Sequence, residues 1–579
     1  MRHRGIWGSQ AVRRETRNPA AALSPSPCEG SLGLRFAVIC TDANWQPWQR
    51  RAVELVASRK CGQLVGVIRV LATVEPIQSL HDQREGSSPS HAVPQQIIAC
   101  PGVNVGRGRW RLTLESVAAI RAMDLDFLLV FGIERLEGGV LEAARHGAWC
   151  FTGFGERADE QAGVLVRPVL ERQALTEVVL VQLGPSIGSD VVLQRAILRT
   201  ARTAQANLAV ATGVMSEWPA SIAAMILAGC SLPVEMLSAD RWSSAVEPSP
   251  SLSRSMSVVT KLAQWLRSKI ESLFTFDQWH VGIASIDFRS VLQNGLPANI
   301  SWASPSPGFG AFYADPMGLE VANGLKVYCE CYNHWIGKGD IRALHYSPHA
   351  GWGQQAERVI SEPFHMSYPY VFDLGDCKVC LPESCEAGVA YAYPLTADGD
   401  IRLEKRRIFL GFEIADPTLI EHNGYWYLFG ASAAEAQHTL RIWFAENLDG
   451  PWTPHPANPV KCDVQTARPA GPIVRLDGKL YRPSQDSTKS YGSAANIMEI
   501  VELSPRAFNE VCVRKIEPDP RWPYPEGVHT LTATRDGVLI DAKVVRISPL
   551  APLLRVANFI GVRLRRRRLS RHHAESASR

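Results

Sequence analysis

The chain has 579 residues, of which 46% are hydrophobic and 20% charged, and its formal net charge is +4 at pH 7. This length exceeds a single hydrophobic core and predicts two or three domains, and the composition excludes a fibrous or wholly disordered chain. Residues 549–579 hold eight Arg and one Glu, and residues 1–34 hold five Arg and two Glu, so the body between them is about −6. A body of that sign is not a nucleic-acid binder on charge grounds.

Residues 1–34 mix Arg, Ser, Pro and Gly without periodicity, which predicts a disordered leader. Apolar, strand-like runs then alternate with helical patterns: strands are predicted at 36–40, 64–71 and 125–131, and helices at 46–58, 114–122 and 137–145. Such alternation is typical of a mostly parallel sheet covered on both faces. We therefore predict an α/β domain over residues 35–242.

Part of this domain resembles the formyltransferase amino-terminal fold. The carrying stretches are LDFLLVFGIERLEGGVLEAARHGAWCF, GSDVVLQRAILRT and SEWPASI. The resemblance implies a Rossmann-like fold that moves a formyl group from a folate cofactor to an amine, such as that of an amino sugar, with an Asn, a His and an Asp. The sequence departs from that pattern, since Thr152-Gly153-Phe154-Gly155 follows Phe151 and offers neither Asn nor His, and Asp190 is at best a displaced acid. We expect a degenerate domain, with a folate formyl donor only if it is active.

Residues 243–278 are predicted to join two domains. Residues 243–256 are rich in Ser and Pro and indicate a linker, and 258–274 is apolar at helical spacing with Lys and Arg opposite. We predict an amphipathic helix packed between the domains, with a membrane-surface role as the alternative.

A repeat begins at Asp315-Pro316 and organises residues 279–545. Four segments open on Pro316, Pro369, Pro417 and Pro469 and run through apolar residues to a turn at Asn323-Gly324, Leu374-Gly375, Asn423-Gly424 and Asp477-Gly478. A fifth has His529 in place of the proline and Asp536-Gly537 at its turn. These are hairpin signals, and their spacings of 53, 48, 52 and 60 residues predict a five-bladed β-propeller. Residues at the repeat openings, namely Asp315, Asp416, Arg468 and His529, should then converge on one channel.

The same region resembles the amino-terminal domain of the plant glucosamine inositolphosphorylceramide transferases and their bacterial relatives, which is similar to the propeller of family 43 glycoside hydrolases. The stretches that carry it include FYADPMG, SYPYVF, LPES, ADPTLI, ARPAGPIVR and GKLYRPSQD. The resemblance implies carbohydrate chemistry and matches Asp315 to the hydrolase base. Glu383 is our candidate proton donor, with Asp416 tuning its pKa, although the hydrolases usually take the acid from a third-blade Glu where this chain has Asp416.

Polar residues at the other openings are candidates for substrate binding. Arg468 and His529 could hold a phosphate, a carboxylate or a sugar hydroxyl. The second strands of the repeats add Gln485, Asp486, Asp541 and Lys543. Structural alternatives remain, since Asp before Pro is a common turn former and Arg468 could belong to a structural ion pair.

Three functional hypotheses follow for this chain. The propeller is a glycan-active enzyme, or a non-catalytic sugar-recognition or scaffold module in a glycan-assembly pathway, or the first domain transfers a formyl group to an amino sugar. The expected partner is a carbohydrate or glycoconjugate, with no nucleic acid.

The remaining expectations concern metals, location and the C-terminus. The 13 cysteines are scattered, and the Cys377–Cys380 pair lacks a second pair, so no metal and no further cofactor are expected. No secretory signal or apolar run of about 18 residues is evident, which predicts a cytoplasmic protein. Residues 546–579 form a basic tail, either solvated and unstructured or in weak peripheral contact with a membrane.

Overall fold

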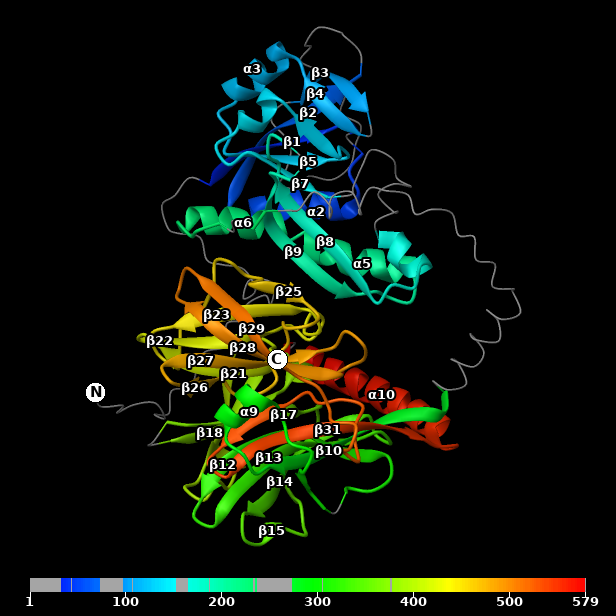
Figure 1. Ribbon diagram of the computed structural model, residues 1–579, viewed down its shortest axis with the longest axis vertical. Coiled ribbons are helices and arrows are strands. Elements are labelled where there is room, and N and C mark those ends of the chain that lie inside the picture. Colours follow the sequence, from blue (N-terminus) through cyan, green and yellow to red (C-terminus); the bar gives the residue numbers. More distant parts are fainter. Residues whose placement is uncertain are drawn as a thin grey trace.

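The computed structural model describes residues 33–42, 44–72, 97–106, 108–152, 165–186, 188–232, 235–236, 273–304, 306–374 and 377–577, with side chains to residue 569. An α/β region lies at one end of the molecule and a β-propeller-like region at the other (Figure 1). Residues 1–32 of the predicted leader, the predicted linker and nearly all of the predicted helix at 258–274 fall outside the described residues, whereas Leu34 already belongs to the first strand.

The α/β region is built on a sheet whose central strands run parallel, in the order β3-β2-β1-β5-β7. Its strands are β1 (Leu34–Cys40), β2 (Gly62–Leu71), β3 (Ile97–Gly106), β4 (Arg109–Leu112), β5 (Phe127–Phe131), β6 (Arg135–Glu137), β7 (Ala148–Phe151), β8 (Leu175–Gln182) and β9 (Val191–Arg199). Its helices are α2 (Pro47–Ser58), α3 (Leu114–Ala122), α5 (Ala204–Met215) and α6 (Trp218–Leu227). Strand β1 is apolar throughout its buried length because both faces are covered. Phe36 and Val38 face one core, and Ala37 and Ile39 face the other.

One predicted helix of this region is wrong. Residues 137–145 contain only the end of β6 and a 3-10 turn, η1 (Gly139–Glu142). Gly138 precedes that turn with φ 83°, a left-handed conformation that interrupts a right-handed helix.

One helical segment, Ala204–Leu227, is long and apolar enough to cross a membrane by length and composition alone. About 72% of its window is buried inside the protein, and Trp218 and Ile222 are fully buried in the core of the α/β region. We therefore interpret α5 and α6 as core helices. The expectation that the chain has no apolar run of this length was therefore wrong for Ala204–Leu227. Most of the apolar side chains of this segment are packed in the core of the α/β region.

The propeller-like region begins at β10 and ends at β31, whose full lengths pair from Thr275↔Ile547 to Ala284↔Val538. The strands before residue 415 are β10 (Thr275–Ala284), β11 (Ser301–Trp302), β12 (Ala311–Val321), β13 (Gly324–Asn333), β14 (Lys338–Ser347), β15 (Gly351–Trp352), β16 (Glu357–Ile360), β17 (Ser367–Asp373), β18 (Lys378–Glu383), β19 (Ala390–Leu395) and β20 (Arg407–Leu410). Those after it are β21 (Ala415–His422), β22 (Tyr425–Ala431), β23 (Thr439–Ala445), β24 (Thr453–Pro454), β25 (Lys461–Asp463), β26 (Val474–Leu476), β27 (Lys479–Asp486), β28 (Ala494–Leu503), β29 (Phe508–Ile516), β30 (Leu531–Thr534) and β31 (Gly537–Ile547). Short helical elements are α9 (Phe288–Asn294), η2 (Cys385–Ala387) and η3 (Leu403–Lys405).

Each predicted repeat opens with an antiparallel hairpin, as its turn sequence indicates: β12–β13, β17–β18, β21–β22, β26–β27 and β30–β31. At two of them both turn residues have positive φ, Asn423 (51°) with Gly424 (81°) and Asp477 (51°) with Gly478 (76°). Asn or Asp before Gly suits this geometry, because both residues tolerate the left-handed region.

The number of separate blades differs from the predicted five. Four sheets stand alone: β11-β10-β31-β30, β12 to β16, β17 to β20, and β26 to β29. Strands β21, β22, β23 and β24 belong instead to a 14-stranded sheet, because β25 pairs with β23 on one side and with β9 of the α/β region on the other. The two regions therefore share one continuous sheet.

A buried ion cluster reinforces this junction. The Glu217 carboxylate, before α6, accepts from Arg441 of β23 (2.9 Å) and from Arg59 at the end of α2 (3.1 Å). Ser221 Oγ donates to the Asn458 carbonyl at 2.7 Å, and Cys462 of β25 is buried within the core of the α/β region.

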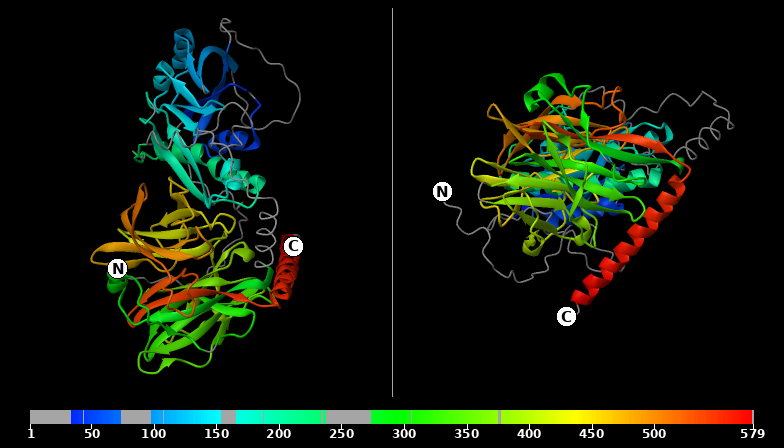
Figure 2. Two further views of the ribbon diagram at one scale, coloured as in Figure 1. Left: turned by 45° about the vertical axis from the view of Figure 1, so that its right-hand side comes forward. Right: turned by 90° about the horizontal axis from the view of Figure 1, so that it is seen from below.

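The C-terminal segment is not an unstructured tail. Residues Ala551–Ala577 form helix α10, which lies along one side of the propeller-like region (Figure 2). Leu554 is fully buried against that region, and Arg565 forms two hydrogen bonds with Glu386, at 2.6 and 2.9 Å. The basic composition of this segment did not predict these contacts.

Candidate functional site

The repeat openings share an unusual backbone geometry that aims side chains into the channel. Asp315, Tyr368 and Asp416 occupy equivalent positions, each before a proline, with φ of 53°, 43° and 48°. At each, the pairing of the first two strands shifts register by one bulge, between Ala314 and Met317 in the first case. Positive φ is costly for non-glycine residues, and such strain concentrates at functional sites.

The same strand register places a second set of side chains at equivalent positions on the neighbouring strands. The residue before each bulge pairs with one on the second strand, 15 residues after the bulged position: Glu330, Glu383 and Ala431. Glu330 is thus the first-repeat equivalent of Glu383. Glu330 was not predicted from the sequence, although its 15-residue spacing from Asp315, matching that from Tyr368 to Glu383, could have indicated it.

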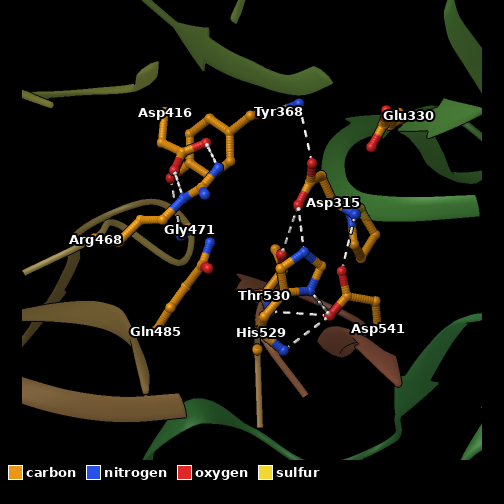
Figure 3. A network of polar contacts seen from close by, with 12 residues as sticks. Asp315, Glu330, Tyr368, Asp416, Arg468, Gly471, Gln485, His529, Thr530 and Asp541 are labelled. Atoms are coloured by element: carbon orange, nitrogen blue, oxygen red, sulfur yellow. Dashed lines mark hydrogen bonds and ion pairs between the residues drawn. The ribbon is translucent and has the colours of Figure 1, made fainter. Parts of the chain in front are cut away.

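Asp315 is held by contacts from two other repeat openings (Figure 3). The Tyr368 N–H donates to Oδ2 (3.2 Å), while Thr530 Oγ1 (3.1 Å) and His529 Nε2 (3.3 Å) contact Oδ1. On its other side His529 Nδ1 contacts Asp541 Oδ1 at 2.7 Å, and Asp541 Oδ2 accepts from the Asp315 N–H at 2.9 Å. The channel therefore contains a buried Asp541–His529–Asp315 chain.

His529 serves that chain rather than an open binding surface. Both ring nitrogens are engaged, the side chain is 2% exposed, and the Trp279 ring lies 4.0 Å from it, centroid to centroid. Burial alone would lower its pKa, but the Asp541 carboxylate outweighs that effect and raises it. Its predicted contact with substrate would require these bonds to be exchanged.

Asp416 and Arg468 form a second cluster across the channel. Arg468 Nε donates to Asp416 Oδ2, Arg468 Nη2 lies 3.3 Å from Oδ1, and the guanidinium lies over the Tyr491 ring at 5.2 Å. The Asp416 N–H donates to Glu383 Oε2 at 3.2 Å. Arg468 is 14% exposed, so it can contact a ligand while paired.

The channel carboxyl groups differ in their readiness to ionise. Burial, then the negative charge of Asp416, raises the pKa of Glu383 to about 8. Burial raises the pKa of Asp315 to about 6, against the opposing effect of His529. Glu330 has a pKa well above its usual range, because it is buried near Asp315 and Glu383. At neutral pH, Glu383 is therefore mostly protonated and Asp315 is mostly ionised.

The structure places the remaining predicted residues differently. Gln485 is buried at the channel and donates Nε2 to the Pro469 carbonyl (3.1 Å), while its Oε1 has no hydrogen-bond partner among the described residues. Lys543 Nζ contacts Ser490, the Tyr491 carbonyl and the Trp279 ring. Asp486 instead binds Thr488 and Lys515, away from the network around Asp315.

Asp315, His529 and Asp541 also have the composition of a cation site, with one ligand atom each within 4.8 Å of the others. The same atoms already hydrogen-bond to one another. A cation there would replace the protons of His529 and their hydrogen bonds.

Two further residues at the rim of the channel, His365 and Tyr332, were not predicted from the sequence because they belong to no motif. His365 Nε2 lies 3.8 Å from Glu330 Oε1, and its ring lies 5.8 Å from that of Tyr332. Burial lowers the pKa of His365 to about 4, so it is neutral at pH 7. These half-buried aromatic and polar groups lie beside Glu330.

In the α/β region, Asp190 forms a buried ion pair with Arg135. Both of its oxygens accept from Arg135 Nη1, at 3.0 and 2.7 Å, and Oδ1 also accepts from the Gly184 N–H. Both side chains are at most 2% exposed. Asp190 is therefore not free to act as the displaced acid considered from the sequence.

Residues 299–520 match the family model for the N-terminal region of glucosamine inositolphosphorylceramide transferase 1. This match covers the channel carboxyl groups Asp315, Glu330, Glu383 and Asp416. The similarity therefore belongs to the propeller-like part of the chain, and the formyltransferase resemblance of the first region stays a prediction.

Curated relatives of that name are similar over the same fraction of the chain. The *Arabidopsis thaliana* protein is 27% identical over 239 residues, which is 40% of this chain and 30% of the relative. The *Oryza sativa* subsp. *japonica* protein is 24% identical over 241 residues, 41% of this chain and 31% of the relative. The chain thus spans about 30% of the length of the relatives it matches.

Solved structures show more distant likeness. CoXyl43, a family 43 β-xylosidase/α-arabinofuranosidase from a compost metagenome, is 14% identical with a TM-score of 0.31, over 41% of this chain and 84% of that one. Zg3597, a family 117 glycoside hydrolase from *Zobellia galactanivorans*, is 12% identical with a TM-score of 0.29, over 46% and 90%.

Proposed function

We propose that the channel of the propeller-like region binds a sugar of a glycan or glycoconjugate and cleaves or transfers it at the glycosidic bond. The observation that carries this proposal is the difference between two carboxyl groups of one channel, Glu383 with a pKa of about 8 and Asp315 with a pKa of about 6. Glycosyl chemistry needs one carboxylic acid that stays protonated and one carboxylate that stays ionised. The named function of the matched relatives, a glycosyl-type transferase, is consistent with sugar as the substrate class.

In this proposal Glu383 donates a proton to the departing oxygen. Asp416 positions Glu383 through its backbone N–H and raises its pKa by its charge, while Arg468 holds Asp416. Asp315 acts as the ionised group that activates the attacking hydroxyl or stabilises positive charge at the sugar. The chemistry is proton transfer by side chains, and it requires no cofactor.

The test is a glycan-array screen followed by product analysis on every bound glycan, with Glu383→Gln alongside the wild type. We expect binding to persist and kcat to fall by about 10²- to 10⁴-fold, because the amide cannot donate that proton. The wild-type rate should rise with pH through about 6 and fall above about 8, and Glu383→Gln should lose the fall at high pH. Glu421→Gln is the matched control, because Glu421 is exposed on β21, the strand that carries Asp416.

The second candidate is a sugar-recognition module without turnover. It is favoured by the bonding of Asp315, whose oxygens already accept from Tyr368 and Thr530 and contact His529. Glycan binding without product on every bound glycan would leave this function and exclude the enzyme. Formyl transfer is a third hypothesis without an identified base, and the cytoplasmic location stays a prediction.

A further inference from the structure

Helix α10 is fixed on the propeller-like region by one face, so its opposite face is defined. Asn558 Nδ2 donates to the Tyr332 hydroxyl at 2.7 Å, and Arg565 binds Glu386. Gly561 lies so close to the Ile336 carbonyl that a Cβ there would come within 2.3 Å of it. This close contact, with Leu554 fully buried, leaves no freedom for the helix to roll about its axis.

The outward face of α10 is apolar. Its large side chains recur at intervals of three or four residues and are 49–63% exposed: Leu553, Val556, Phe559, Ile560 and Leu564. Such spacing places them on one side of a helix. A soluble surface rarely leaves so many large apolar side chains together without a partner.

The loops against the attached side of α10 also carry exposed apolar side chains. Phe309, Trp335 and Ile336 are 41–53% exposed. Trp335 and Leu554 both approach Gly310, and Ile336 approaches Gly561, so these loops lie beside the helix. We call the five outward residues of α10 the α10 face, and these loops flank the helix from which it projects.

Positive charge borders the α10 face. Arg563, Arg566, Arg567 and Arg568 are exposed on the same helix, directly after the apolar positions. An apolar helical face with flanking arginines and a tryptophan is the composition of segments that lie at a membrane interface. A second copy of the chain would bring like charges together across a two-fold contact, and a nucleic acid would leave the apolar side chains unmatched.

We propose that the α10 face docks on an anionic lipid surface. The apolar side chains enter the boundary between headgroups and acyl chains, and the arginines contact the lipid phosphates and carboxylates. Tyr332 and Glu386, which hold α10, also border His365 at the rim of the channel. Docking therefore brings that rim close to the lipid surface.

The test is co-sedimentation of the full chain with phosphatidylcholine vesicles, with and without phosphatidylserine. We expect binding to the anionic vesicles, weakened at high salt and reduced roughly 30-fold by Arg567→Gln with Arg568→Gln. Phe559→Ser with Ile560→Ser should reduce binding to the same vesicles. Val511→Ser with Val513→Ser is the matched control, because these exposed valines lie on β29, away from α10.

Several outcomes would overturn the proposal. They are the absence of wild-type binding to anionic vesicles, equal binding to neutral vesicles, and binding that both pairs of α10 substitutions leave unchanged. A concentration-dependent dimer that Phe559→Ser with Ile560→Ser abolishes, without vesicle binding, would identify a second copy as the occupant. All the substituted side chains are exposed, and an unchanged thermal midpoint would show that the fold is retained.

Discussion

The same residue type meets opposite environments at the junction and in the channel. Glu217, at the junction, is buried, which would raise its pKa, but Arg441 and Arg59 outweigh burial and lower it to about 2. Glu383, in the channel, is raised to about 8 by burial and by the neighbouring Asp416. The difference shows that burial alone does not decide the charge of a carboxyl group. Neighbours make Glu217 a stabilising ion and keep Glu383 a protonated acid.

The largest expected effect comes from neutralising Glu217 at the junction. Glu217→Gln should lower the free energy of unfolding by about 3–5 kcal/mol, because it removes the shared counter-charge of Arg59 and Arg441. The measurement is urea denaturation, with hydrogen exchange of β9 and β25 to locate the loss. Glu142→Gln is the control, since Glu142 pairs with Arg121 at the surface (3.9 Å) and should cost less than about 1 kcal/mol. Equal effects of the two substitutions would contradict the role of Glu217.

The raised pKa of Glu383 predicts that its contribution to stability depends on pH with the opposite sign to that of Glu217. A carboxyl with a raised pKa stabilises the fold fully below its unfolded pKa, near 4.5, and loses that contribution as pH rises toward about 8. A lowered pKa, as in Glu217, gives stability that is lost only as pH falls from near 4.5 toward about 2.

Glu383→Gln should therefore be more stable than the wild type at pH 8, on the order of 4 kcal/mol, with the difference fading toward pH 4.5. Denaturation midpoints at a series of pH values measure this directly. A difference that grows as the pH falls would show that Glu383 is ion-paired instead.

The smallest expected effect concerns positive φ, which occurs both at a hairpin turn and inside the channel. Asn423 has φ 51° at an exposed hairpin turn, whereas Asp416 has φ 48° inside the channel. Asn423→Ala should cost about 1–2 kcal/mol of unfolding free energy. It should leave sugar binding and turnover unchanged, because it alters only backbone strain and an exposed hydrogen bond to His422 at the turn. Asn423→Gly should restore stability to within about 0.5 kcal/mol. Loss of activity in Asn423→Ala at constant stability would mean that the turn, too, belongs to the site.

The sequence predicted what local patterns encode. The Asn423-Gly424 and Asp477-Gly478 hairpins follow from turn chemistry, and the proline-opened repeats led directly to Asp315 and Asp416. Glu330 was missed because it belongs to no motif, and its 15-residue spacing from Asp315 gains meaning only once the register opposite Ala314 is known.

The junction and α10 could not be predicted from local patterns. The pairing of β25 with β9 joins residues more than 260 positions apart, Ala196 with Cys462 and Ile197 with Asp463. The contact between Arg565 and Glu386 likewise depends on the path of α10 across the propeller-like region. In the α/β region, the glycines before η1 ended a segment whose apolar spacing indicated a longer helix.

The shared sheet has a consequence for any attempt to divide this protein. Cutting the chain between the α/β region and the propeller-like region would free one edge of β9 and one edge of β25 at once, since each now pairs with the other. Free strand edges recruit other chains, so both fragments should tend to aggregate even if each kept its own core. A truncation that abolished activity would thus report misassembly rather than the location of chemistry. Recombination or gene fusion at this point would also have to supply a replacement strand for each edge.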